Sequence, residues 1–506
     1  MIDLPFVLFP LWTLLLGFVF GALFWKHRKA QRVIALVVSS VYLAAAVSLF
    51  AVVQQEGTQV VQIGNWPAPL GITLVADGFA ALMVLIAAVV AFAVTIYSFQ
   101  DISGNRLEYG FYPVVMAMMF GVTGSFLTGD VFNLYVWFEV MLVASFVLIV
   151  LGNSKAQLEG AVKYVLLSFL SSGFLLTGIG ILYRITGTLN MAELSLAIAE
   201  HPDPELITVA AVFFFMGFGM KAAVFPLFSW LPASYPTPPI SVSALMAGLL
   251  TKVGVYAFIR FFTLLFTHDI PLTHTFLLII SGLTMFFGVL GAVAQNDFRK
   301  ILSFHIISQI GYMVMGLALF TPLAIAGAIF YIIHHILVKT NLFLISGIVE
   351  QTHGYSRLDK LGGVYRLFPF VTVLFVISAF SLAGVPPLSG FWGKFVLAQE
   401  GLAEGEYLIV GVSLLVGLLT LFSMTKIWKA AFWSPLPSGQ EERLHYDQAS
   451  LWKSKYALLI SSGFLAFLTL CLTFYPEPLL SYSKELAEQL LHPQGYIDAV
   501  LNKNTQ

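Results

Sequence analysis

Charged residues and cysteine are scarce in this sequence. Asp, Glu, Lys and Arg make up only 10% of its 506 residues, whereas an average globular domain has about 25%. Hydrophobic residues reach 59%, so an ordinary soluble domain is excluded. The single cysteine, Cys471, lies inside an apolar run and cannot form an intrachain disulfide. The net charge of −1 gives no indication of a nucleic-acid partner.

Motifs for the common catalytic and nucleotide-driven devices are also missing. The sequence has no GxxxxGK[ST] phosphate loop, no zinc-type cluster of Cys and His, and no nucleophile elbow in a suitable context. Its loops are short, so no large soluble domain is available to bind a nucleotide. We therefore expect a membrane protein that is not an enzyme and that holds neither a cofactor nor a metal ion.

What the sequence has in abundance is apolar runs of roughly 20 residues, the length with which a helix crosses a bilayer core of about 30 Å. The first run follows MIDLP, which lacks a basic region, and precedes KHRKAQR, so a retained span is expected rather than a cleaved signal peptide. Leu479, Tyr482, Leu486 and Leu490 are spaced as in a short interfacial helix. The runs predict an all-α protein with fourteen transmembrane spans, near 4–25, 33–54, 72–98, 110–128, 131–152, 160–186, 205–232, 239–266, 275–294, 301–320, 322–349, 367–398, 408–433 and 455–475.

Lys and Arg are distributed unequally between the two sides of these spans. The loops on one side hold 16 of the 25 Lys and Arg, with Arg299 and Lys455 among them. The loops on the other side hold three, namely Arg184, Lys484 and Lys503. Because basic loops stay in the cytoplasm, this asymmetry predicts that both termini lie outside it.

The other six cations fall within predicted spans: Lys163, Lys221, Lys252, Arg260, Lys339 and Lys394. A charge at the bilayer centre costs about 2.5 to 3.5 kcal/mol, so such residues usually face a cavity, a partner or an ion path. Arg260 and, less so, Lys163 lie close enough to a span end to snorkel. Lys221, Lys252 and Lys339 lie too deep, which favours a functional role.

One carboxylate is comparably deep, and several histidines accompany the lysines. Glu139 lies well inside the fifth span, whereas Asp77 lies near the outer end of the third and fits a helix start or a pore mouth equally well. Burial favours the neutral forms of a Glu and a Lys, and pairing favours their charged forms. A Glu139–Lys221 pair that forms and breaks could therefore relay protons.

The eleventh span adds His334 and His335 in FYIIHHILVKTNLFLISG, and His335 shares a helix face with Lys339 four residues later. Such histidines can be hydrogen-bonded core residues, but beside a central lysine a proton-carrying role is favoured. A metal site is disfavoured because no further ligands lie at this depth.

Prolines interrupt two spans beside a lysine. Pro226 follows Lys221, and Pro386 and Pro387 precede Lys394, so helices seven and twelve should be broken. The two breaks are five spans apart, as expected for inverted repeats of spans four to eight and nine to thirteen. The predicted parts are residues 1–109, 110–266, 267–433 and 434–506. Glu139, Lys221 and Lys252 fall in the first repeat, and His305, His334, Lys339 and Lys394 fall in the second.

Six motifs, in order, carry a resemblance to a known family: FEVMLV, FGMKAAVFPLFSWLP, SALMAGLLTKVGVY, NDFRKILSFHIISQIGYM, HHILVKTNLFLISG and GVPPLSGFWGKF. The chain resembles the antiporter-like subunits shared by respiratory complex I, membrane-bound hydrogenases and Mrp (Mnh) cation/proton antiporters. The resemblance implies that Glu139 and Lys221 form the essential pair, that Lys252 is the central relay lysine, and that Lys394 is the terminal one. It also implies assembly side by side with other subunits in a prokaryotic cell membrane.

The loop PLFSWLPASYPTPP and SFHIISQIGYM, which includes His305, are similar to the D-type subunits of Mrp antiporters. Complex I relatives commonly carry two histidines where this chain has Phe228 and Tyr235, so Lys163 or water would have to take up protons from the cytoplasm. The leading interpretation is a proton-translocating subunit of a sodium/proton antiporter driven by the proton motive force. The alternatives are a proton-pumping subunit of a redox complex and a stand-alone antiporter. A sodium path is not assigned, because sodium needs several oxygen ligands and one deep carboxylate is present.

Overall fold

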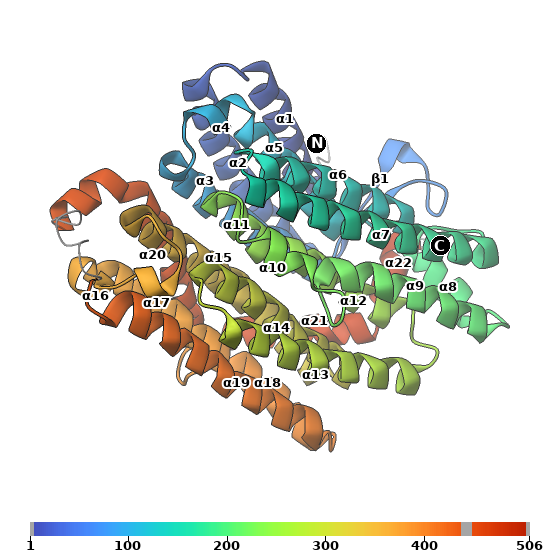
Figure 1. Cartoon of the computed structure of the whole chain (residues 1–506). Helices are drawn as coiled ribbons and strands as arrows, with labels where there is room; N and C mark the ends of the chain where they lie inside the picture. Colours follow the sequence, from blue (N-terminus) through green and yellow to red (C-terminus); the bar gives the residue numbers. More distant parts are fainter. Residues whose placement is uncertain (1–4, 437–447, 502–506) are drawn as a thin grey trace.

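In the computed structural model, which describes residues 5–436 and 448–501, the chain is almost wholly helical (Figure 1). Residue 4 of the first predicted span and the predicted loop or tail cations Arg443 and Lys503 lie outside the described residues. Within those ranges twelve helices are long and apolar enough to cross a membrane. They are η1–α1 (Phe6–Leu23), α2 (Arg28–Glu56), α3 (Gly78–Asp101), α6 (Val131–Val150), α7 (Lys155–Thr186), α9 (Pro204–Ala222), α11–η3–α12 (Ile240–Leu264), α13 (Ile270–Ala294), α14 (Phe298–Leu319), α15 (Pro322–His353), α19–η5 (Tyr407–Trp433) and Ser454–Phe474 of α20 (Gln448–Phe474).

Two shorter apolar helices, α5 (Phe111–Leu127) and α17 (Pro369–Ala383), occupy the places of the fourth and twelfth predicted spans. Each of the fourteen predicted spans therefore coincides with an apolar helix. The third span begins later than predicted, because Thr73–Ala76 forms a strand, β2, that pairs with β1 (Gln59–Gln62).

Small elements gather at the two ends of the bundle. The β1–β2 hairpin lies at the same end as α8 (Met191–Ala199) and α22 (Gln494–Leu501), because α22 packs on both. The expected helix after the last span is α21 (Glu477–Leu491), and it packs on α15 and α12. The opposite end, which is rich in Lys and Arg, carries α4 (Gly104–Glu108), η4 (Leu358–Lys360) and α16 (Val364–Leu367).

Burial divides the helices into an inner and an outer set. The α11–α12 span is buried throughout, and α14 and α15 are nearly so. Helices α1, α2, α7 and α19 instead expose many large apolar side chains, as expected where lipid or another subunit covers them. In Figure 1, α15 lies between the blue and green N-terminal helices and the orange helices that follow it.

The segments from α6 to α8 and from α14 to α16 repeat the same local geometry. Helices α7 and α15 each have 32 residues and end at a left-handed glycine, Gly187 and Gly354. Asp130 caps α6 and pairs with Asn190 in an isolated antiparallel bridge. Asp297 caps α14 and pairs in the same way with Arg357.

The two proline-containing spans also break alike. Helix α9 ends at Ala222 and α17 ends at Ala383, and the next residue is left-handed in both: Ala223 and Gly384. Two residues after each helix ends, a valine N–H bonds back to a carbonyl, Val224 to Gly219 at 3.0 Å and Val385 to Phe380 at 3.1 Å. This is the Schellman arrangement that closes a helix.

After the turns the chain resumes as α10 (Trp230–Ser234) and α18 (Ser389–Ala403), so the predicted spans 205–232 and 367–398 are interrupted. Pro226, Pro386 and Pro387 lie on the exposed side of these turns. The carbonyl groups freed at the helix ends, rather than the proline rings, therefore face the interior.

Candidate functional site

Several predicted residues lie in the most buried part of the bundle. Lys252 on α12 has no exposed surface, and neither do His334, His335 and Lys339 on α15 or His305 on α14. These three helices form the inner set, so neighbouring helices rather than lipid surround the titratable groups. Cations placed this way cannot snorkel to the membrane surface.

Lys252 follows a π-helical turn, η3 (Met246–Leu250), which interrupts the regular hydrogen bonds of its span. Its Nζ donates to the carbonyl of Ala247 in that turn at 2.6 Å. Such π-turns are rare and often accompany functional sites. Lys339 reaches across to the next helix and donates to the carbonyl of Leu302 at 3.3 Å. Both ammonium groups are thus held by backbone carbonyls.

The buried histidines are only partly satisfied. His305 Nε2 lies 2.5 Å from the hydroxyl of Ser423, and His334 Nδ1 lies 2.9 Å from that of Ser389. Among the described residues the other ring nitrogen of each has no partner, and His335 has none at either nitrogen. Lys252 and Lys339 both lie within electrostatic range of His335. His335 is therefore a buried polar group near two buried amines.

Lys394 on α18 reaches back to the break before it. Its Nζ donates to the carbonyls of Leu382 and Ala383 at 3.1 and 3.2 Å, where α17 ends. The carbonyl end of a helix favours a cation, and the face of Tyr312, 4.6 Å from Nζ to the ring centroid, adds a cation–π contact. The break at span twelve therefore supplies the carbonyl groups that bind the Lys394 ammonium group.

Glu139 and Lys221, the expected pair, are near each other but not bonded. Glu139 is half-buried and accepts a hydrogen bond from the hydroxyl of Ser172 on α7. Lys221 lies at the end of α9, with Nζ 5.8 Å from the centroid of the Phe138 ring. It is within electrostatic range of Glu139, but the described residues contain no ion pair between the two. The structure thus places the pair in a separated arrangement.

Lys163 lies apart from the other predicted residues. Its side chain is 52% exposed and forms an ion pair with Glu159 one turn earlier on α7, with Nζ 2.8 Å from Oε1. Geometry therefore gives no support to a role in passing protons into the interior.

The interpretation of Arg260 as a snorkelling residue is wrong. Its guanidinium is buried and bonds the Asp77 carboxylate at 2.5 Å, while Tyr256 lies 3.3 Å away on the preceding turn. Asp77 also caps α3 by accepting from the Ala80 N–H, as the helix-start interpretation predicts. Arg260 turns inward because α3 supplies an opposite charge at the same depth.

Asp77 borders a polar cavity of about 460 Å³ where α2 and α3 meet the C-terminal helices. Glu485 and His492 also line it. Burial raises the pKa of Tyr482 and Tyr496, which face this cavity, so both hydroxyls stay protonated. In the described ranges no three His, Cys, Asp or Glu side chains come close enough to hold a metal ion.

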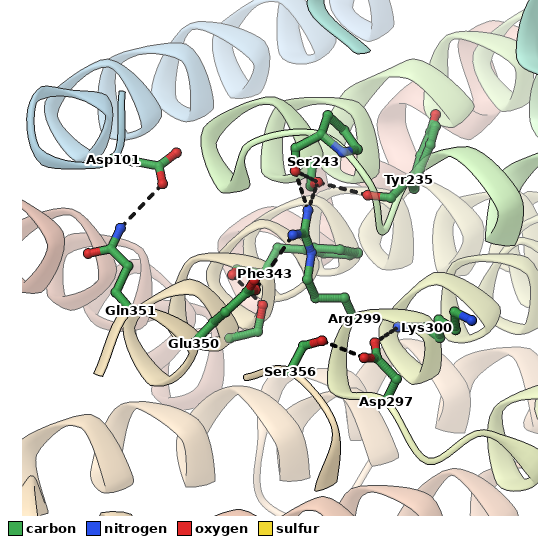
Figure 2. A network of polar contacts seen from close by, with 12 residues as sticks. Asp101, Tyr235, Ser243, Asp297, Arg299, Lys300, Phe343, Glu350, Gln351 and Ser356 are labelled. Atoms are coloured by element: carbon green, nitrogen blue, oxygen red, sulfur yellow. Dashed lines mark hydrogen bonds and ion pairs between the residues drawn. The ribbon is translucent and has the colours of Figure 1, made fainter. Parts of the chain in front are cut away.

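Sequence reasoning missed a second charged cluster, at the end rich in Lys and Arg (Figure 2). Arg299 counts as a loop cation by sequence, but it lies in the first turn of α14 and is only 7% exposed. It forms an ion pair with Glu350 on α15. The signal in the sequence is that Glu350 follows Lys339 by eleven residues, which places both on one helix face.

A multi-pass helical bundle with buried lysines and histidines on its inner helices belongs to the class of membrane proteins that move ions or protons through a polar interior. A transmembrane family described as NADH:quinone oxidoreductase/Mrp antiporter matches residues 128–420. The chain belongs to this family, and within it to the antiporter subunits of the D type.

Two bacterial relatives that are D subunits match this chain over almost their whole length. The chain is 48% identical to the D subunit of the Na(+)/H(+) antiporter of Alkalihalophilus pseudofirmus, over 97% of this chain and 98% of that protein. It is 41% identical to the corresponding D subunit of Bacillus subtilis, over 98% and 99%.

Solved structures share the fold. A chain in the structure of the Mrp complex from Dietzia sp. DQ12-45-1b is 32% identical, with a TM-score of 0.89 over 98% of this chain and 99% of that one. A chain of respiratory complex I from Thermus thermophilus is 22% identical, with a TM-score of 0.79 over 95% and 99%. At that identity the second likeness concerns the fold alone.

Proposed function

We propose that this chain is the D subunit of a multisubunit sodium/proton antiporter in a bacterial cell membrane, where it carries the proton. It assembles with the other subunits of an Mrp-type complex, and it is a transporter rather than an enzyme. The observation that carries the proposal is the group of buried amines and imidazoles on the inner helices, Lys252, His334, His335 and Lys339. Each is costly to bury, and none has a carboxylate partner among the described residues.

The proposed path runs between the Glu139–Lys221 pair at one end and Lys394 at the other. Lys252, His335 and Lys339 lie between these ends, and His335 is within electrostatic range of both lysines. Amines held only by carbonyl groups can lose a proton without breaking an ion pair. Protons can therefore pass from one group to the next through small rearrangements and water.

The separated arrangement of Glu139 and Lys221 supports a switching role. The Glu139 carboxylate accepts a hydrogen bond from Ser172 and has no ion pair with Lys221 among the described residues. When the two approach, pairing favours the charged form of each, and when they separate, burial favours the neutral forms. Closing and opening this pair would bind and release a proton at that end of the path.

The repeated geometry supports two inverted units, residues 110–266 and 267–433, flanked by 1–109 and 434–506. The capping aspartates of α6 and α14, the equal lengths of α7 and α15, and the matching breaks after α9 and α17 all fall in corresponding places. Five spans in each unit give them opposite directions in the membrane. Each unit brings a lysine to its break, Lys221 or Lys394.

The alternative, a proton-pumping subunit of a redox complex, rests on a shared fold. A chain of an archaeal membrane-bound sulfane sulfur reductase has a TM-score of 0.89 but is only 23% identical. The identity of 48% to the D subunit of an antiporter favours the antiporter. Purification of the native complex separates the two: small membrane partners without flavin or iron–sulfur subunits support the antiporter, and redox subunits support the alternative.

Alanine variants of the first pair test the proposal. We expect Glu139→Ala and Lys221→Ala each to abolish sodium-dependent proton exchange in everted vesicles at alkaline pH, while the complex still assembles. Glu139→Asp should retain part of the exchange, because a carboxylate remains. Lys155→Ala, at an exposed lysine, is the matched control and should exchange normally. Normal exchange in either Glu139→Ala or Lys221→Ala would contradict the proposed proton relay.

A further inference from the structure

A second polar cavity, of about 380 Å³, lies at the end of the bundle rich in Lys and Arg. Four charged side chains line it: Asp101 at the end of α3, Arg106 on α4, Arg299 on α14 and Glu350 on α15. Figure 2 shows Asp101, Arg299 and Glu350 converging from three different helices. Segments far apart in the sequence therefore meet around one polar space.

Asp101 is firmly held. One carboxylate oxygen accepts from the backbone N–H of Ser241 at 2.8 Å and from its hydroxyl at 2.7 Å. The other accepts from Gln351 at 3.3 Å, and Lys455 donates to Gln351 at 3.5 Å. Because both oxygens are bonded, Asp101 is a fixed part of the wall.

Arg299 is held by the loop before α11. It donates to the carbonyl of Pro238 and to the hydroxyl of Ser243, the latter at 2.7 Å. Ser243 in turn donates to the carbonyl of Tyr235 at 2.7 Å. The Tyr235 carbonyl therefore fixes the hydroxyl that in turn holds Arg299.

Glu350 is held much more loosely. Its Oε2 lies 3.5 Å from Arg299 Nη1 and is buried without a hydrogen bond among the described residues, although the side chain as a whole is 34% exposed. Arg299 Nε is equally unsatisfied. The Asp77–Arg260 pair at the other end closes to 2.5 Å. An unsaturated carboxylate beside a polar cavity is a place where water and a proton can be accepted.

Arg299 and Glu350, in the wall of this cavity, lie on the same two helices as the contact made by Lys339. Lys339 donates to the carbonyl of Leu302, which is three residues, or about one helical turn, from Arg299 on α14. Along α15, Lys339, Ser346 and Glu350 lie on one face, since seven and eleven residues are nearly whole numbers of turns. The buried hydroxyl of Ser346 stands between the two charged groups.

We propose that this cavity is the site at which protons from the end rich in Lys and Arg enter the buried path, with Glu350 as the residue that binds them. Arg299 holds the deprotonated carboxylate and releases it when a proton binds. This inference rests on the proposed function and adds the place of proton uptake to it.

The step needs only protons and rearranged hydrogen bonds. Glu350 takes a proton from water in the cavity, which weakens its ion pair with Arg299. The neutral acid then gives that proton, through water along the Ser346 face, to the neutral amine of Lys339. Glu350 becomes a carboxylate again and Lys339 an ammonium, so the charge moves inward and the Arg299 contact is restored.

Accessibility of position 350 tests the site directly. In a Cys471→Ser chain within the assembled complex, Glu350→Cys should react with a membrane-impermeant cationic thiol reagent in everted vesicles and resist it in right-side-out vesicles. Asp359→Cys, an exposed position near the end of α15, is the positive control. No reaction at position 350 in everted vesicles, or reaction only in right-side-out vesicles, while Asp359→Cys behaves as expected, overturns the inference.

Exchange measurements test the role of the carboxylate. Glu350→Gln should lower sodium-dependent proton exchange by about tenfold or more, because a positioned proton-transferring group is lost. Glu350→Asp should recover part of it, because a carboxylate remains, and Asp359→Asn should exchange normally. If Glu350→Gln exchanges normally while Glu139→Ala does not, the inference fails and the proposed function stands. If Glu139→Ala also exchanges normally, the proposed function itself fails.

Discussion

Arg260 and Lys163 both lie near the end of a predicted span, and both admit the same snorkelling interpretation. In the structure one is buried against Asp77 and the other is exposed beside Glu159. The difference arises from what faces each residue across the bundle: α3 brings a carboxylate to Arg260, whereas the Lys163 side chain is left 52% exposed by the described residues. Sequence position gives the depth of a charge, but not the direction in which it points.

The buried Asp77–Arg260 pair should be essential for stability. Removing one partner leaves an uncompensated buried charge, so Arg260→Gln should cost about 3 to 5 kcal/mol. Replacing both, as Asp77→Asn with Arg260→Gln, should recover much of this loss. Thermal melting of the purified complex measures both effects. Arg184→Gln, at an exposed arginine, should change the stability by less than about 0.5 kcal/mol. A wild-type melting temperature for Arg260→Gln would show that the pair contributes nothing.

Among the described residues, length and hydropathy alone predicted the twelve helices long enough to cross a membrane and the two shorter apolar ones, α5 and α17, because a bilayer allows few alternatives to a helix of about 20 apolar residues. The hairpin of β1 and β2 was missed, since the apolar residues of Thr73–Ala76 read as the start of the next span. The repeat was visible only as two proline breaks. The paired bridges at Asp130 and Asp297 depend on contacts sixty residues apart, which periodicity does not show.

The buried group of lysines and histidines could be predicted because charge deep in an apolar run is conspicuous. Glu350 and Arg299 could not, because they lie at helix ends, where charged residues are common. Only the packing of α14 against α15 reveals that they face each other. Elements that meet at the ends of a bundle are therefore the part of the site that requires the structure.

The break after α17 gives a prediction at the scale of the element. Gly384 is left-handed, and a Cβ there would lie 2.9 Å from Cδ of Lys394. Gly384→Ala should therefore push Lys394 away from its carbonyls and lower exchange, in addition to a backbone strain of about 1 to 2 kcal/mol. Gly405 is also left-handed, but a Cβ there meets no atom within 4 Å.

Gly405→Ala is therefore a matched control that carries the strain without the contact. Exchange per assembled complex, measured in everted vesicles, should fall for Gly384→Ala and stay normal for Gly405→Ala. Equal exchange activity of the two variants would show that exchange does not depend on the contact between Lys394 and the carbonyls of Leu382 and Ala383.

The charge asymmetry gives a prediction for the orientation of the whole molecule. Several cations that were counted in loops, Arg299 and Lys455 among them, lie within helices. The end that carries α4, η4 and α16 still holds most of the Lys and Arg, among them Arg106, Arg357 and Lys360. This asymmetry predicts that the cavity at Glu350 faces the cytoplasm and that the cavity at Asp77 faces the outside.

Reporter fusions check this orientation. Alkaline phosphatase joined after residue 506 should be active, because it folds only outside the cytoplasm, and green fluorescent protein at the same place should be dark. Fusions after Ser434, which follows η5 at the opposite end of the bundle, should give the reverse pattern. The thiol reaction at Glu350→Cys must follow the same assignment, since both depend on which end meets the cytoplasm. Active phosphatase after Ser434 would show that the orientation is the reverse of the predicted one. The cavity at Asp77, rather than the cavity at Glu350, would then face the cytoplasm.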